Sequence, residues 1–282
     1  MSFRVDGTAG ITRLRRPETR FLSTGFDGGP SVGDAAYNLT VPEGWGEEGP
    51  RDLRTYAAER LTEVGFDPAP DAPVLLTGVD QRHARVARLD SVVALATVGL
   101  SNPAALPVEV SGSMDRRRPV SAAERGDETN PPIGTVNLLV GTTRSLAPGA
   151  LANLVAVVAE AKATTLLSTA GFPGTTSDAI VVGCAANGAG SRGGQDTVGS
   201  RGGEDAQETG AKGSPESGRT PAPFSGAATP VGAAARACVR DAVLASLRSR
   251  YANEPIPKSV EAAEYGVITA QRADVSPVDD GT

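Results

Sequence analysis

Lys162 is the residue of this sequence best placed to do chemistry. Only three of the 27 basic residues are lysines, namely Lys162, Lys212 and Lys258, and the others are arginines. Residues 151–167 predict a helix, and a rotation of about 100° per residue places Lys162 within its apolar stripe. A lysine in such a stripe extends to its edge, pairs with a carboxylate or becomes reactive through burial. Lys162 is therefore a candidate catalytic residue, and a structural ion pair is the alternative.

Two carboxylates are candidates to act with this lysine. Asp178 begins a predicted strand directly after the turn at 171–177. It either closes that turn with a side-chain hydrogen bond or serves as a general base or substrate anchor. Glu160 falls on the opposite side of the predicted helix from Lys162, where a solvated surface carboxylate is the simpler interpretation. We keep both carboxylates as candidate catalytic residues.

Three asparagines lie at the edges of predicted elements, namely Asn38, Asn102 and Asn137. An amide side chain in a strand is unfavourable unless it is hydrogen-bonded. Each asparagine therefore either binds an amide-rich ligand or ties a loop in place.

The sequence offers no recognisable metal or nucleotide site. His83 is its one histidine, and a surface histidine among arginines is a simpler interpretation than a general base. Cys184 and Cys238 stand in apolar contexts that predict buried small hydrophobes. Zinc-ligand spacing, a nucleotide-binding glycine motif and a G-x-S-x-G elbow are all missing from the sequence. We therefore expect no metal and no cofactor.

The composition indicates an acidic, water-soluble protein. The chain has 282 residues, 39% of them hydrophobic, and a formal net charge of −6. This charge disfavours non-specific nucleic-acid binding. We see neither a membrane-length apolar run nor a secretory signal, and expect a cytoplasmic protein. Scarce lysines, excess acid and 4% aromatic residues are typical of proteins of salt-loving archaea, and a GC-rich genome is the alternative explanation.

The apolar patterns predict an α+β domain with a mixed, largely antiparallel sheet covered by helices. Hairpin-like strands outnumber strict strand–helix–strand units, so a doubly wound α/β fold is the second choice. The predicted strands are a pair within 2–24, then 36–41, 74–79, 91–98, 135–140 and 178–184. The predicted helices are 51–64, 148–167 and 230–251, and loops are expected at 26–33 and 111–132.

We expect one domain over residues 1–252, with two segments outside its core. Residues 186–222 are glycine-rich and poor in large aliphatic side chains. Such a composition predicts a disordered insertion. Residues 253–282 predict an acidic, flexible tail.

The candidate residues recur in a longer pattern that resembles the adenosylcobinamide amidohydrolase family. The resemblance covers nearly all of residues 3–251. Its motifs are Gly28–Gly29 leading to Asn38; Gly99, Ser101 and Asn102; Gly134, Thr135 and Asn137; Leu146, Gly149, Ala150 and Leu151; Glu160, Ala161 and Lys162; and Gly174 to Asp178. Three positions depart from the family pattern, since Ala159 replaces an expected threonine, Thr176 an expected glycine and Ser177 an expected threonine.

The resemblance implies hydrolysis of one amide, which releases aminopropanol from adenosylcobinamide and gives adenosylcobyric acid for coenzyme B12 salvage. The corrinoid would be the substrate and not a cofactor. It implies catalytic roles for Lys162, Asp178 or Glu160. Substrate-binding roles would fall to the three asparagines, Gly28, Gly29, Thr176 and Ser177. The last two hydroxyls are alternative nucleophiles. The rival functions are a non-catalytic corrinoid carrier and a salt-adapted structural partner, and a homo-oligomer is compatible with all three.

Overall fold

The computed structural model describes residues 1–42, 45, 52–108, 135–186, 220–263 and 265–278. The predicted loop at 111–132 and most of the predicted insertion at 186–222 lie outside the described residues. The helices are α1 (Leu53–Glu63), α2 (Pro148–Ala170) and α3 (Pro230–Arg250), with a 3-10 helix at Gln81–His83. The strands are β1 (Arg4–Thr8), β2 (Ile11–Ser23), β3 (Gly29–Thr40), β4 (Val74–Thr77), β5 (Arg85–Leu89), β6 (Val92–Val98), β7 (Pro103–Ala105), β8 (Val136–Thr142), β9 (Gly174–Thr175), β10 (Ala179–Ala185) and β11 (Val267–Ile268).

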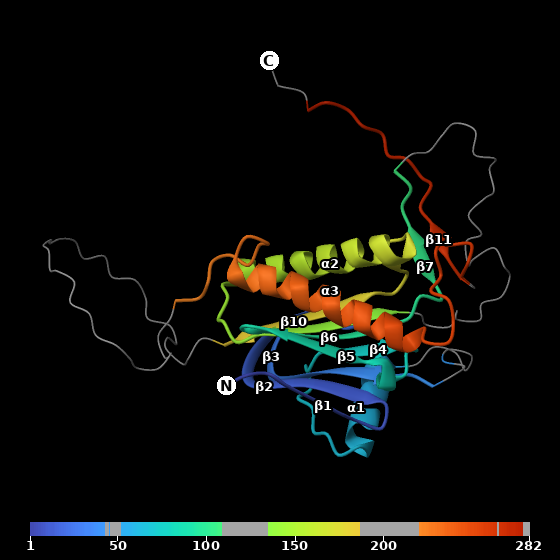
Figure 1. Ribbon diagram of the computed structural model, residues 1–282. Coiled ribbons are helices and arrows are strands. Elements are labelled where there is room, and N and C mark those ends of the chain that lie inside the picture. The colour runs from blue at the N-terminus through green and yellow to red at the C-terminus, as the bar shows by residue number, and fades with distance from the viewer. Residues whose placement is uncertain (43–44, 46–51, 109–134, 187–219, 264, 279–282) are drawn as a thin grey trace, which may run out of the picture.

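One mixed sheet organises the fold (Figure 1). Its strands follow the order β4-β3-β2-β10-β8-β6-β5, and β1 pairs with β2. The pairs β10–β8 and β3–β4 are parallel, whereas the other pairs of this sheet are antiparallel. This arrangement confirms the predicted α+β class with a largely antiparallel sheet, rather than the doubly wound alternative.

The long β2–β3 hairpin bends the sheet back on itself. Its register shifts between Arg15 and Thr19, where Pro17 has no N–H to donate and Glu18 has φ of 53°. The bend lets β3 and β4 contact β8, although neither strand neighbours β8 in the ladder. The sheet therefore forms two facing leaves, with α2 and α3 outside one leaf and α1 outside the other (Figure 1).

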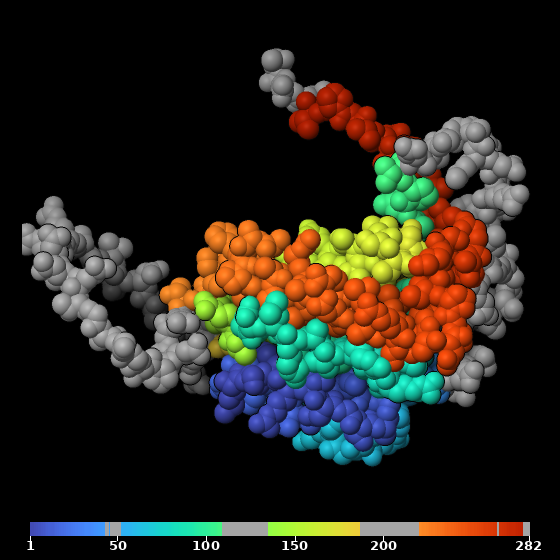
Figure 2. Space-filling model, in the orientation of Figure 1, coloured from blue at the N-terminus to red at the C-terminus, as the bar shows by residue number. Residues whose placement is uncertain are grey.

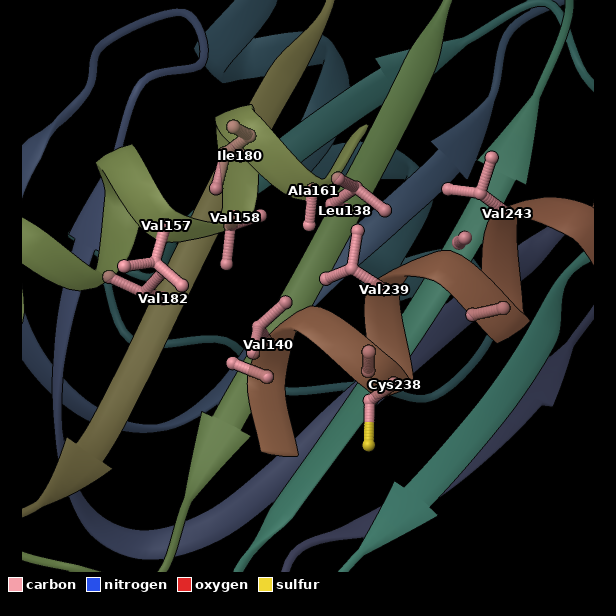
Figure 3. Close-up of a cluster of buried hydrophobic side chains, with 14 of the residues drawn as sticks. Leu138, Val140, Val157, Val158, Ala161, Ile180, Val182, Cys238, Val239 and Val243 are labelled. Carbon is pink, nitrogen blue, oxygen red and sulfur yellow. The ribbon is translucent and has the colours of Figure 1, made fainter. Parts of the chain in front are cut away.

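Three apolar clusters hold these layers together. The largest lies between the sheet and helices α2 and α3 (Figure 3), the second lies between the two leaves, and the third lies under α1. The alternation of side chains along β8 serves two of them. Leu138 and Val140 belong to the helix-side cluster, and Leu139 belongs to the cluster between the leaves.

One helix in the described part of the chain, α2, is long and apolar enough to span a membrane by length and composition. In the fold, Leu154, Val158 and Leu166 of this helix pack into the helix-side cluster. The helix lies along α3 above the sheet, and together the two helices form one side of the molecule (Figure 2). A core helix of a soluble protein passes the same test, so the hydropathy of α2 is explained by its packing.

Several elements differ from the sequence-based expectations. Strand β3 begins at Gly29, within the predicted loop at 26–33. The prediction missed its first half because that half is largely exposed and carries no apolar pattern. Strand β5 is exposed and arginine-containing, and β7, β9 and β11 have only two or three residues each. Hydrophobic periodicity does not reveal strands of these kinds.

The predicted boundaries of the domain also change. Ala222 forms a bridge with Leu146, so described structure resumes before the expected end of the insertion. Strand β11 falls within the segment expected to be a flexible tail and pairs with β7. Main-chain hydrogen bonds, which the composition of a segment does not report, account for both differences.

We predict that Leu139→Ala destabilises the protein much more than Val32→Ala. Leu139 is buried between the two leaves, whereas the side chain of Val32 on β3 is 61% exposed. Removing a buried leucine side chain costs about 2–5 kcal/mol of unfolding free energy, and an exposed truncation costs roughly 0.5 kcal/mol or less. Chemical unfolding of both variants measures the difference. Equal losses would contradict a packed core between the leaves.

Candidate active site

Most of the candidate residues lie at one edge of the sheet, where β8 and β10 both begin. Asn137 is the second residue of β8 and pairs in register with Ala179, the first residue of β10. Asp178 directly precedes β10, and Lys162 reaches it from α2. Parallel strands begin at the same edge, which is why residues separated by 41 positions along the chain (Asn137 and Asp178) become neighbours.

Lys162 and Asp178 form an ion pair within this edge. The Nζ atom of Lys162 contacts Oδ2 of Asp178, and their side chains are only 13% and 10% exposed. Asp178 also accepts hydrogen bonds from the N–H of Val136 at 3.0 Å and from Thr175, through its N–H at 3.1 Å and through its hydroxyl. The carboxylate thus joins α2, β8 and the turn that precedes β10.

This arrangement decides what each partner of the pair is suited to do. Four donors already share the two oxygens of Asp178, so this carboxylate is poorly placed to take a proton from water. An ammonium group has three N–H donors, and Asp178 needs only one of them. Lys162 is therefore suited to donate hydrogen bonds to a negatively charged oxygen or to protonate a leaving amine.

Gly174 leaves the space that the ion pair occupies. A Cβ atom built on this residue would lie 2.7 Å from Nζ of Lys162 and closer still to Oδ2 of Asp178. Its backbone needs no glycine-specific conformation, because its φ is not positive. The requirement for glycine here is steric, and it comes from the two charged side chains.

Asn102 and Thr176 form a second contact at the same edge. The Nδ2 group of Asn102 donates to Oγ1 of Thr176 at 2.6 Å, and the N–H of Thr176 donates to the main-chain oxygen of Asn102 at 3.1 Å. Asn102 is 4% exposed, and its side-chain oxygen has no hydrogen-bond partner among the described residues. Thr176 and Ser177 are both exposed, so their side chains lie at the rim of the site.

Asn38 and Asn137 meet across the two leaves. Asn137 donates from Nδ2 to Oδ1 of Asn38 at 2.8 Å and to the main-chain oxygen of Leu76 at 2.9 Å. Asn38 donates to Thr97 at 3.0 Å and to Gln81 at 3.4 Å. Both acceptors of Asn137 are oxygens, which fixes its amide with the nitrogen toward them. Its Oδ1 atom is left buried without a partner in the described part of the chain.

Sequence reasoning did not find the residues that orient Asn38. Gln81 accepts from Thr12 at 2.7 Å and donates to Thr40 at 3.2 Å, in addition to its contact with Asn38. Gln81 lies in a three-residue 3-10 helix, which carries no periodic signal. Polar side chains on buried strand positions, such as Thr97, were the available clue.

The structure does not bring Glu160 to this site. Its carboxylate pairs with Arg236 of α3 at 2.9 Å, and its side chain is 64% exposed. Glu160 and Lys162 therefore lie on different faces of α2, as the helix rotation predicts. Gly28 lies in the turn between β2 and β3, and Gly29 is the first residue of β3. This turn is close to the start of β10, because Thr24 exchanges hydrogen bonds with Ile180.

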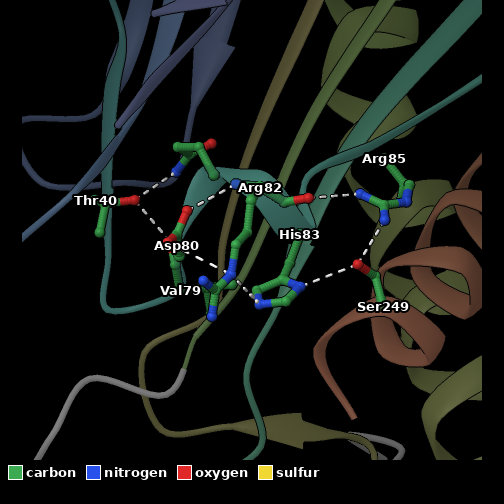
Figure 4. Close-up of polar contacts among 8 residues, drawn as sticks. Thr40, Val79, Asp80, Arg82, His83, Arg85 and Ser249 are labelled. Carbon is green, nitrogen blue, oxygen red and sulfur yellow. Dashed lines mark hydrogen bonds and ion pairs between the residues drawn. The ribbon is translucent and has the colours of Figure 1, made fainter. Parts of the chain in front are cut away.

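His83 belongs to a separate polar cluster between the 3-10 helix and α3 (Figure 4). Arg82 donates to Nε2 of His83 at 3.0 Å, so Nδ1 carries the proton and faces Ser249 at 3.0 Å. Arg85 also donates to the hydroxyl of Ser249. Burial and the neighbouring charges of Arg82, Arg250 and Arg85 lower the pKa of His83, against a smaller opposite effect of Asp80.

The described residues contain no group of three or more His, Cys, Asp and Glu side chains that could hold a metal ion. Cys184 and Cys238 are buried and unpaired by disulfides, as their apolar sequence contexts predict. Burial raises the pKa of the Cys238 thiol to about 11, which makes it a poor nucleophile at neutral pH.

The fold and this edge together define an α+β enzyme with a buried lysine–carboxylate pair, of the kind suited to cleaving a polar bond by proton transfer and charge stabilisation. The family model described as "CbiZ: Adenosylcobinamide amidohydrolase" matches residues 4–209. A protein of Halobacterium salinarum named "Adenosylcobinamide amidohydrolase" is 48% identical over 266 residues, covering 94% of this chain and 95% of that protein. The chain belongs to the adenosylcobinamide amidohydrolase family.

We predict that Gly174→Ala lowers turnover at least about tenfold while Gly149→Ala does not. The added methyl group of the first variant would displace Lys162 from Asp178, whereas nothing lies within 4 Å of a Cβ built on Gly149. Because alanine favours a helix over glycine by roughly 0.5–1 kcal/mol, the Gly149 variant should be as stable as the parent or more so. Kinetics and thermal melts of both variants provide the measurement. Normal turnover of Gly174→Ala would show that the pair is not needed.

We predict that protonation of His83 destabilises the folded protein in weakly acidic solution. The folded state lowers the pKa of His83 below its ordinary value of 6.5, so the unfolded state binds the proton more readily. Stability is then unaffected by His83 above pH 6.5 and declines as the pH falls below it. Thermal melts between pH 7.5 and 5 should show a shallower decline for His83→Gln. Parallel curves for the variant and the parent would contradict this assignment.

Proposed function

We propose that this chain hydrolyses the amide that joins aminopropanol to the corrin of adenosylcobinamide, releasing adenosylcobyric acid and aminopropanol. Water supplies the oxygen that binds the carbonyl carbon, the C–N bond breaks, and the amine leaves with a proton. The observation that carries the proposal is the Lys162–Asp178 pair, buried at the edge where the family's motif residues converge. Membership of the family and the name of the relative from Halobacterium salinarum support the same reaction.

Lys162 is the catalytic residue in this proposal. As the carbonyl carbon becomes tetrahedral, its oxygen gains negative charge, and an ammonium donor aimed at that oxygen lowers the barrier. The same group can supply the proton that the leaving amine needs and then regain a proton from the water that attacks the carbonyl carbon. Asp178 acts on Lys162 rather than on water, since its oxygens are engaged by Val136, Thr175 and the lysine.

The asparagines suit a substrate with many carboxamide groups. The side-chain oxygens of Asn102 and Asn137 are buried acceptors without a partner among the described residues, and a substrate carboxamide would offer N–H donors to them. Binding would satisfy acceptors that no described residue satisfies, which makes recognition selective for amides over carboxylates. Asn38 would position Asn137 through the hydrogen bond between them.

The two glycines before and at the start of β3 differ in how much space surrounds them. A Cβ atom built on Gly29 would meet nothing within 4 Å, whereas one on Gly28 would collide with main-chain oxygens of Ser23 and Gly25. Gly28 therefore shapes the turn, and Gly29 presents open surface. Thr176 and Ser177 would contact the substrate from the opposite loop. The amide nitrogen of Asn102 donates a hydrogen bond to the hydroxyl of Thr176. Asn102 therefore does not act as a base for that hydroxyl, and attack by water is favoured over attack by Thr176.

The corrinoid is the substrate in this proposal, and the protein requires no cofactor of its own. The product would re-enter coenzyme B12 assembly, so the reaction serves corrinoid salvage. The acidic, lysine-poor composition supports action in the cytoplasm of a salt-loving archaeon. A non-catalytic carrier finds no support in the comparisons.

The proposal predicts that Lys162→Met loses turnover by roughly 10²- to 10³-fold, the loss that typically follows removal of one donor to an oxyanion. Glu160→Gln, an exposed change on the same helix, should keep the turnover of the parent. Adenosylcobinamide is incubated with each protein in molar KCl, and adenosylcobyric acid and aminopropanol are quantified by mass spectrometry.

Each outcome separates the alternatives. No product from the folded parent protein would refute the amidohydrolase function, and tight corrinoid binding in that sample would identify a carrier. Product formation by Lys162→Met at the parental rate would keep the function but refute the role of the lysine. Loss of turnover in Glu160→Gln would return Glu160 to the site.

A further inference from the structure

The edge that holds the candidate site continues into a second, small sheet. Its strand order is β11-β7-β9. Strand β9 is Gly174–Thr175, whose residues contact Asp178 directly. It pairs with β7 through Pro103↔Thr175 and Ala104↔Gly174. Asn102 immediately precedes β7. The central strand β7 therefore follows one residue of the site and pairs with β9, which holds another part of it.

The third strand of this small sheet comes from the far C-terminal segment. Strand β11 pairs with β7 in parallel, and both lie at the end of the molecule where α2 ends (Figures 1 and 2). The N–H of Tyr265 donates to the main-chain oxygen of Ser101 at 3.0 Å, and the N–H of Thr269 donates to Ala105 at 2.9 Å. These hydrogen bonds hold the main chain on both sides of Asn102 and Pro103.

The segment is also anchored before it reaches β11. Lys258 donates from Nζ to the main-chain oxygen of Thr169 near the end of α2. Its own main-chain oxygen lies 2.8 Å from where a Cβ of Gly171 would be. Gly171 has φ of 81° and ends α2. The segment therefore contacts the chain just before the Gly174–Asp178 turn as well as just before Asn102.

We propose that residues 256–263 and 265–269 form a positioning element of the active site, which holds Asn102 and the Gly174–Asp178 turn in the geometry that the Lys162–Asp178 pair requires. Pairs of two residues between two strands are marginal on their own, and a third strand makes such a sheet more stable. The segment contributes no side chain to the reacting atoms. It lies outside the residues matched by the family model, and its role rests on the proposed amidohydrolase function.

Two substitutions in the full-length protein should detach β11. Thr269→Pro removes the N–H that Ala105 accepts. Gly266→Val adds a side chain where a Cβ already meets Val260 and lies 3.4 Å from the main-chain oxygen of Pro103. Val275→Pro is the matched control, since Val275 is 93% exposed and lies beyond the paired residues.

We expect the two detaching variants to lose at least about tenfold in kcat, with a smaller change in KM, and the control to match the parent. Rates are expressed per folded protein, with the folded fraction measured by circular dichroism at the assay temperature. An unchanged kcat per folded protein in both detaching variants would overturn the proposal. An inactive parent would instead refute the proposed function, so the two failures are distinguishable.

A double-mutant cycle tests whether the segment acts through the site. If the segment positions Asn102, the double variant Thr269→Pro/Asn102→Ala should lose much less kcat, relative to the parent, than the product of the two single losses. A purely structural contribution would leave the two effects independent. Multiplicative losses would therefore refute the positioning role even if Thr269→Pro alone lowers kcat.

Discussion

The carboxylate of Asp178 is the point on which the arrangement of the site depends. It accepts hydrogen bonds from α2 through Lys162, from β8 through the N–H of Val136, and from β9 through Thr175. A buried carboxylate is costly unless it is fully paired, and here its three partner residues come from three different elements. The same four donors that stabilise its charge therefore fix the relative positions of the helix, two strands and a turn.

The sequence predicted the larger elements of this fold because their side chains carry periodic signals. Helices α2 and α3 and the buried strands β6, β8 and β10 all follow apolar patterns that match their environments. The bend at Pro17 and Glu18 was not predictable in this way. It arises from a register shift and one left-handed residue, and it decides that Asn38 meets Asn137 rather than lying on a remote part of the sheet.

The site could be predicted in part for a similar reason. Lys162 stood out as the lysine within an apolar helix face, and its burial follows from that position. The contact between Lys162 and Asp178 depends on how α2 lies over β10, which no local pattern reports. Gln81 escaped notice because its partners Thr12, Asn38 and Thr40 are distant along the chain. Local sequence identified the reactive groups, and tertiary packing decided which of them meet.

The central place of β10 in the sheet has a consequence for how the protein is made. This strand joins the hairpin of β2 and β3 to β8, and its residue Ile180 bonds to Thr24 across 156 positions of sequence. During synthesis, the edges of β2 and β8 that pair with β10 therefore stay unpaired until most of the chain has left the ribosome. Such non-local pairing makes folding slow and exposes the nascent chain to aggregation. The net negative charge of the polypeptide opposes that aggregation by keeping incomplete chains apart.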